Sequence, residues 1–163
     1  MRAYLLLLTL ALSGVSACSA QQPLSQSTPS QTAKAALHPV SGLAVIPLTV
    51  SSGGKAHRFQ VEVAATPAQQ EQGLMFRREM GANEGMIFPH EFPRVASFWM
   101  KNTVLPLDII FIGPDKRIIN VAANTTPFSL DPVPSAGPTS AVLELNAGRS
   151  AQLGLKTGDL VSW

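Results

Sequence analysis

The segment Ser97–Ile112 constrains the fold of this chain most strongly, because it places polar residues between two apolar runs. It reads SFWMKNTVLPLDIIFI. The apolar runs predict two strands, over 95–100 and 107–112, joined by a polar loop that ends at Pro106. A polar group buried without a partner costs roughly 1–3 kcal/mol. We therefore expect the polar members of the segment at one edge of the strands, bonded to one another or doing specific work: Lys101, Asn102, Thr103 and Asp108.

The remaining pattern is typical of a mostly β domain. Further β-prone runs lie between turns at residues 43–50, 57–64, 85–88, 118–121, 141–145 and 160–163. A short helix is predicted over 66–73, because Thr66, Pro67 and Gln69 form a capping box with proline in the first turn. Short helices are also predicted over 74–80 and 149–153, and a surface loop over 124–139. The predicted fold is α+β and mostly β, a compact barrel-like or rolled, largely antiparallel sheet with two or three short helices.

The N-terminus resembles a bacterial lipoprotein signal. Arg2 precedes the apolar run Leu5–Leu12, which is too short to span a bilayer. Small residues then lead into Cys18, and Val15-Ser16-Ala17-Cys18 is similar to a lipobox. The resemblance implies a signal peptide over 1–17, acylation of Cys18, and attachment to membrane lipid in the bacterial cell envelope. Ser19 implies the outer membrane, facing the periplasm. The alternative is an ordinary soluble signal with an unrelated cysteine.

Composition narrows the chemistry of the mature protein. Cys18 is the only cysteine, so its use as an anchor leaves no thiol for catalysis, metal binding or disulfide exchange. Residues 18–40 are rich in Ser, Gln, Thr, Pro and Ala and are predicted to be the lipidated cysteine and a disordered tether. Residues 41–163 are predicted to form one globular domain. Charged residues make up 13% of the chain and its net charge is +2. The sequence has no basic cluster of the kind that binds nucleic acid, so nucleic acid is not expected as a partner.

Four separated segments of the domain resemble one protein family. They are Gln72–Arg77, Gly85–Phe88, Phe98–Thr103 with Leu107–Phe111, and Val142–Gly148 with Gly158-Asp159. In this order and spacing they are similar to a small bacterial and archaeal family, domain of unknown function 192, over roughly Phe59–Trp163. The resemblance implies a single compact, β-rich domain, often exported and sometimes membrane-attached. The family has no established activity, so the resemblance implies no catalytic residue.

The polar loop and Asp108 form the first candidate site. Asp108 begins an apolar strand face, so we expect its carboxylate to accept hydrogen bonds from residues 101–103, or to line a polar pocket with Lys101 or Arg77. The loop offers a cation, an amide and a hydroxyl beside Trp99, which suits a small anionic or hydroxylated ligand with an apolar wall. The alternative is a turn that Asn102 and Thr103 stabilise by bonding the backbone.

Other candidates are less clear from sequence. One of the adjacent arginines, Arg77 or Arg78, is expected to pair with Glu144 or Asp108, while the other faces solvent. Alternation along 141–145 predicts that Glu144 faces solvent, with a place in a pocket as the alternative. Thioethers suit Cu(I), which makes a copper site conceivable. Methionines mostly fill core gaps, however, and the spacing of these residues is not typical of a metal site: Met75, Met80, Met86, Met100, His57 and His90.

These patterns lead to one main functional hypothesis and two alternatives. The main one is an envelope lipoprotein that binds a small polar ligand or an envelope protein, without a cofactor, through some of seven residues: Arg77, Trp99, Lys101, Asn102, Thr103, Asp108 and Glu144. The first alternative is an enzyme acting on envelope carbohydrate or a related substrate, using Asp108 and Glu144 with Lys101 or Arg77. The second is a copper accessory protein. No nucleophile elbow, zinc motif or phosphate-binding loop is present in the sequence.

Overall fold

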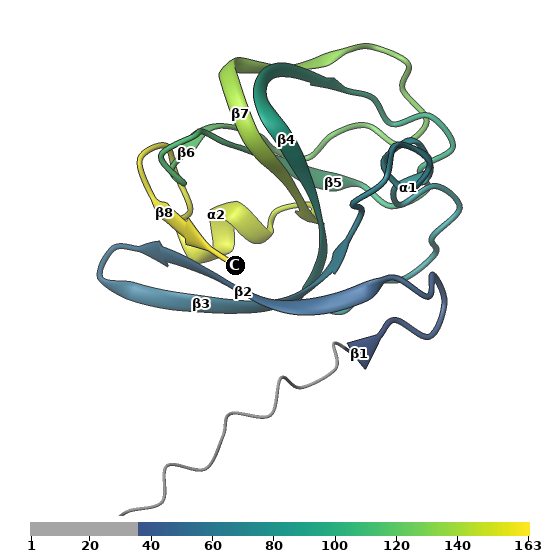
Figure 1. Cartoon of the computed structure of the whole chain (residues 1–163), viewed down its shortest axis with the longest axis horizontal. Coiled ribbons are helices and arrows are strands. Elements are labelled where there is room, and N and C mark those ends of the chain that lie inside the picture. Colours follow the sequence, from purple (N-terminus) through teal and green to yellow (C-terminus); the bar gives the residue numbers. More distant parts are fainter. Residues whose placement is uncertain (1–35) are drawn as a thin grey trace, which may run out of the picture. The chain divides into compact units, whose positions relative to one another are not determined.

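A computed structural model describes residues 36–163 of the chain (Figure 1). The predicted signal peptide, Cys18 and most of the predicted tether lie outside these residues. The elements run in the order β1 (Ala36–Leu37), β2 (Ala44–Ser52), β3 (Lys55–Val63), α1 (Pro67–Gln72), β4 (Glu84–Phe98), β5 (Leu107–Ile112), β6 (Ile118–Ala122), β7 (Val133–Asn146), α2 (Arg149–Leu153) and β8 (Leu160–Ser162). Strand β1 therefore falls within the last residues of the predicted tether.

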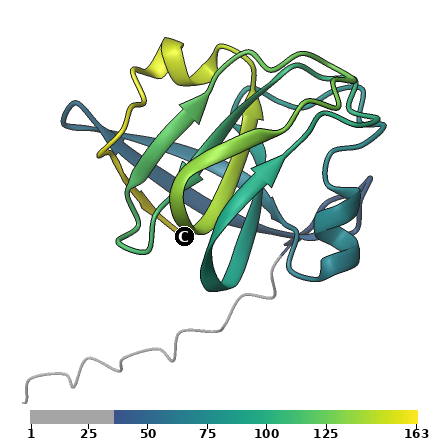
Figure 2. The ribbon, with the colours of Figure 1, turned by 90° about the horizontal axis from the view of Figure 1, so that it is seen from above.

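The strands form one mixed sheet. Their order is β1-β2-β3-β4-β7-β5-β6, and β8 pairs with β2. All pairs are antiparallel except β3 with β4, whose connection carries α1. The prediction of a mostly β, largely antiparallel fold is confirmed. The sheet curls (Figure 2) but is not closed into a barrel. An isolated bridge between Arg117 and Leu160, rather than a strand ladder, connects the turn before β6 to β8.

Both faces of the central strands are buried. All six residues of β5 are buried, and its five apolar residues face two different apolar clusters. Ile110 and Ile112 belong to the first cluster with Phe59, whereas Ile109 and Phe111 belong to the second. A strand covered on both faces reads as a continuous apolar run, which is the pattern of Leu107–Ile112.

Helix α1 begins as the sequence predicts. The Thr66 hydroxyl accepts from the Gln69 amide at 3.3 Å, and the Gln69 side-chain oxygen accepts from the Thr66 amide at 2.9 Å. The helix predicted over 74–80 is wrong, because these residues form turns and irregular backbone in which Phe76 has a φ of 62°. Neither α1 nor α2, the described helices, is long and apolar enough to cross a membrane.

Two of the predicted strand boundaries also differ. Residues 85–88 and 95–100 were expected to form separate strands, but most of them belong to the long strand β4, whose pairing with β7 shifts register between Pro89 and Arg94. The register shift absorbs the prolines that suggested a turn. Residues 133–139, predicted as loop, are the first half of β7.

Candidate functional site

Glu144 holds the most unusual side chain of the described domain. The expectation that it faces solvent is wrong, since the residue is only 5% exposed. It shares its face of β7 with Val142 of the second apolar cluster, and Met86 and Ile109 lie opposite it on the neighbouring strands. No hydrogen bond joins its carboxyl group to another residue of 36–163. Burial raises the pKa of Glu144 from 4.5 to about 8, so the carboxyl group is mostly protonated at pH 7.

Glu144 lines a pocket of about 340 Å³. Trp99, Lys101 and Thr103 line the same pocket, so four of the seven predicted binding residues meet there. Phe88 and Phe98 add aromatic surface, with ring centroids 5.1 Å apart in an edge-to-face arrangement. The polar side chains and the thioether around the mouth come from α1, the residues after it, and β4: Gln70, Glu71, Gln72, Met75, Arg94 and Ser97.

The loop over 101–103 is both a turn and a pocket wall. Thr103 donates its hydroxyl hydrogen to the Lys101 carbonyl at 3.1 Å. Asn102 has a φ of 54°, a left-handed conformation that asparagine tolerates, and its carbonyl accepts from the Phe76 amide at 2.8 Å. Its side-chain amide donates to the Met75 sulfur at 3.8 Å. Asn102 therefore shapes the loop, while its two neighbours, Lys101 and Thr103, line the pocket.

Asp108 lies apart from this pocket and holds α2 in place. It is fully buried, and its carboxylate accepts from three backbone amides: Asn124 at 2.9 Å, Gly148 at 3.0 Å and Ser150 at 2.8 Å. The expectation that residues 101–103 donate these bonds is wrong. The carboxylate instead replaces the missing partners at the start of α2, where amides have no acceptor within the helix.

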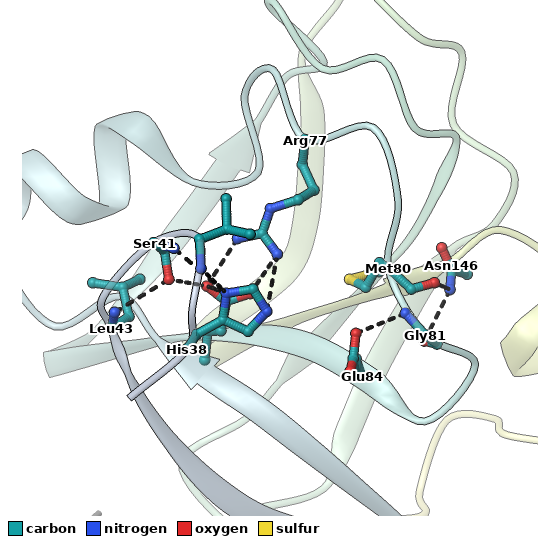
Figure 3. Close-up of polar contacts among 10 residues, drawn as sticks. His38, Ser41, Leu43, Arg77, Met80, Gly81, Glu84 and Asn146 are labelled. Carbon is teal, nitrogen blue, oxygen red and sulfur yellow. Dashed lines mark hydrogen bonds and ion pairs between the residues drawn. The ribbon is translucent and has the colours of Figure 1, made fainter. Parts of the chain in front are cut away.

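Arg77 also lies outside the Glu144 pocket. Its Nη1 and Nη2 atoms are 2.8 and 3.0 Å from the two carboxylate oxygens of Glu62, which is 3% exposed. The expected partners, Glu144 and Asp108, are not the ones found. The Ser41 hydroxyl donates to Glu62, and His38 Nδ1 lies 3.6 Å from the same carboxylate. Figure 3 shows the arginine reaching toward His38 and Ser41, so this network fastens the segment after β1 to β3.

The arrangement argues against the two-carboxylate and copper hypotheses. Asp108 lies opposite Leu145 and Glu144 lies opposite Ile109, so the two carboxyl groups point to opposite faces of the sheet. The Met100 sulfur accepts from Thr125 at 3.1 Å, as the Met75 sulfur does from Asn102. Met86 and Met100 are buried in the second apolar cluster, where they fill the core. Within residues 36–163 no three His, Cys, Asp or Glu side chains are grouped to hold a metal ion.

Sequence reasoning missed most of the apolar and amide lining of the pocket. Gln70 and Gln72 have no pattern that distinguishes them from other exposed helix residues. Gly73 was predicted only as the end of the helix, whereas in the structure a Cβ atom there would lie 3.4 Å from the Phe88 ring. No sequence signal marked Glu62 as buried, since alternation along β3 predicts that its side chain faces outward. Its partner Arg77 approaches from another part of the chain.

Comparisons with known proteins agree on the family. Residues 48–163 match the profile described as Uncharacterized ACR, COG1430 (DUF192). No curated protein matches the chain. A protein of unknown function from Novosphingobium aromaticivorans DSM 12444 is 54% identical, with 83% of this chain and 97% of that chain covered and a TM-score of 0.78. A "putative transcription regulator" from Sinorhizobium meliloti 1021 is 40% identical, with coverages of 74% and 94% and a TM-score of 0.72. The chain belongs to the DUF192 family, the domain of unknown function 192.

Proposed function

We propose that the pocket around Glu144 binds a small, uncharged, hydroxylated ligand such as a sugar ring. One observation carries the proposal: a neutral carboxyl group is buried at the pocket wall without a hydrogen-bond partner in the described domain. Its oxygens are open to the pocket rather than enclosed by protein, so water or a ligand hydroxyl in the pocket can complete their hydrogen bonds. A protonated carboxyl group both donates and accepts, which matches a ligand hydroxyl.

The other walls also suit a ring. Trp99 is about half exposed and offers an aromatic face on which the apolar side of a ring can lie. Gln70 and Thr103 add acceptor oxygens, since their hydrogens already go to backbone carbonyls. The pocket volume of about 340 Å³ is near the lower end for ligand sites, which favours a single ring. The mouth carries two cations, Lys101 and Arg94, and one exposed carboxylate, Glu71, so the test of the proposal includes anionic ligands.

Isothermal titration of the purified protein with individual monosaccharides tests this proposal. The neutral probes are glucose, galactose and N-acetylglucosamine, and the anionic probes are glucuronate and phosphate. We expect at least one neutral sugar to bind, and Glu144→Leu or Trp99→Ala to weaken binding at least about tenfold, because each loses about 1.4 kcal/mol or more. Glu144→Gln keeps a donor and an acceptor and is the matched control. Binding that Glu144→Leu leaves unchanged, or binding of the anions alone, contradicts the proposal.

We also propose that acyl chains on Cys18 hold the domain at a membrane, with the outer membrane as the expected one. The support is the apolar run Leu5–Leu12, the small residues before Cys18 and the absence of another cysteine from the sequence. Each buried methylene of an acyl chain contributes about 0.8 kcal/mol to membrane binding. Cys18→Ser should release the protein from the membrane fraction, whereas Ser27→Ala, in the predicted tether, should not. Retention of the Cys18→Ser protein argues against lipidation. Density separation of the two membranes tests which one holds it.

A further inference from the structure

Two exposed phenylalanines have unfavourable backbone conformations. Phe76 and Phe128 have φ values of 62° and 63°, in the left-handed region that bulky residues rarely adopt. Their side chains are 65% and 59% exposed. Neither gains core packing from this conformation. Strained backbone that persists in a fold is often tied to function, and here it displays two aromatic rings.

The two phenylalanines sit on either side of one loop. The Phe76 amide donates to the Asn102 carbonyl at 2.8 Å, and the Phe128 amide donates to the Thr103 carbonyl at 3.2 Å. Three more exposed apolar side chains belong to this loop or to its neighbour, and Trp99 and Leu130 line a common hollow. We call the set the apolar rim: Phe76, Trp99, Val104, Phe128 and Leu130.

The apolar rim and the first described residues lie at the same side of the domain. Figure 1 shows the loops after α1, after β4 and after β6 together on the right-hand side, next to α1. Phe76 and Val40 line one pocket of about 650 Å³. Val40 is 75% exposed, so this side carries apolar surface up to the point where the described chain begins.

We propose that the apolar rim lies on the surface of the phospholipid bilayer to which the chain is anchored, so that the Glu144 pocket opens toward lipid headgroups. This inference rests on the proposed anchor at Cys18. Trp and Phe side chains, with a lysine beside them, are typical of the membrane–water interface. Lys101 Nζ lies 5.0 Å from the centroid of the Trp99 ring. The ligand of the pocket would then be a hydroxylated headgroup.

The length of the chain before the domain supports a membrane over a protein partner. Residues 19–35 join Cys18 to β1 and belong to the tether that composition predicts; a random coil of that length would span roughly 23 Å. An anchored domain is therefore held close to the bilayer at high effective concentration, so a small apolar surface suffices for contact. Because the described chain begins on the side of the apolar rim, a short connection favours that side facing the bilayer.

The two tryptophans of the chain allow a controlled test. Trp99 belongs to the apolar rim, before β5. Trp163 packs under Lys116, whose Nζ lies 3.4 Å from the centroid of the ring. Lys116 is in the turn that follows β5, whereas Trp99 precedes that strand, which is about 20 Å long. The Trp163→Phe variant reports on Trp99 alone, and the Trp99→Phe variant reports on Trp163 alone.

Full-length lipidated protein, purified from the membrane fraction, is reconstituted into phosphatidylcholine vesicles, with and without brominated acyl chains that quench tryptophan. We expect Trp99 emission to shift to shorter wavelength in vesicles and to be strongly quenched by bromine, while Trp163 emission changes in neither respect. Phe76→Ser with Phe128→Ser should remove most of the quenching. Phe92→Ser is the matched control, because Phe92 is 72% exposed but lines a different pocket.

Each outcome decides the proposal. Unquenched Trp99 overturns membrane contact and leaves a protein as the candidate partner of the apolar rim. Equal quenching of both tryptophans overturns the assignment to this side of the domain. Failure of the lipidated protein to float with the vesicles overturns the anchor and the docking together. Glu144→Leu should abolish sugar binding but leave the quenching of Trp99 intact, so the ligand proposal and the docking proposal fail separately.

Discussion

Replacing Glu144 by glutamine tests whether the pocket holds a neutral carboxyl group. Glutamine has nearly the same shape and forms hydrogen bonds, but it does not ionise. The pKa of Glu144 is raised from 4.5 to about 8 by burial in the folded state. Because the folded state holds this proton more tightly than the unfolded state, the contribution of Glu144 to the free energy of unfolding is most favourable below pH 4.5. It falls as the pH rises toward 8.

The size of the effect follows from the two pKa values. One pH unit between them changes the free energy of unfolding by about 1.4 kcal/mol. At pH 7 the wild type has therefore lost about 3 kcal/mol relative to pH 4.5 through this residue. Glu144→Gln avoids that loss. We expect the variant to match the wild type at pH 4.5 and to be about 3 kcal/mol more stable at pH 7.

Urea unfolding at pH 5, 6, 7 and 8, followed by tryptophan fluorescence, measures the difference. Taking variant minus wild type at each pH cancels the titration of the histidines, which both proteins share. Glu71→Gln is the matched control, since Glu71 is an exposed carboxylate at the mouth of the same pocket and its replacement should change stability little. A difference between Glu144→Gln and wild type that stays constant from pH 5 to 8 would refute the reasoning.

Three further substitutions test the supports of the site by the same unfolding assay at pH 7. Asp108→Asn should destabilise the domain by about 3 kcal/mol, because the NH₂ group of asparagine would face at least one backbone N–H group, which is also a donor. A loss of stability below about 1 kcal/mol contradicts the capping role of Asp108. Arg77→Met should cost about 3 kcal/mol by leaving the Glu62 carboxylate buried without its cation, and adding Glu62→Met should recover most of it. If the Arg77→Met/Glu62→Met variant is no more stable than Arg77→Met alone, the unpaired Glu62 carboxylate is not the cause of the lost stability. Thr66→Ala should lower the free energy of unfolding by about 1 kcal/mol through loss of the helix cap. An unchanged urea midpoint contradicts a stabilising role of this cap.

Features that depend on neighbouring residues could be predicted from the sequence. Thr66 and Gln69 are three residues apart, and the geometry of a helix start brings any such pair together. The apolar run Leu107–Ile112 predicts a strand because its pattern requires burial on both faces. The loop over 101–103 lies between two predicted strands, so its place at a strand end also follows from local sequence.

Glu144 and Arg77 could not be placed in this way, because their surroundings come from distant parts of the chain. Glu144 looks outward when β7 is considered alone. It is buried because residues 70–75 and the loop carrying Trp99 lie over that face, and their positions depend on the tertiary fold. The Arg77–Glu62 pair likewise depends on the parallel pairing of β3 and β4 and on the path between them. Sequence alternation reports which residues share a face, but not what covers it.

The pairing of β5 with β7 has a consequence for the fidelity of folding. Asp108 and Glu144 project to opposite faces, one toward the amides of α2 and the other toward the pocket. A shift of β7 by one residue would exchange these faces, moving Glu144 toward the cluster of Ile110 and Ile112 and bringing Leu143 or Leu145 to the pocket wall. Such a misaligned sheet would bury a carboxyl group in a fully apolar site. Burying Glu144 costs stability in the native sheet at neutral pH, but it costs more in the misaligned sheet, where the site is fully apolar. The carboxyl group therefore favours the native register over the shifted one.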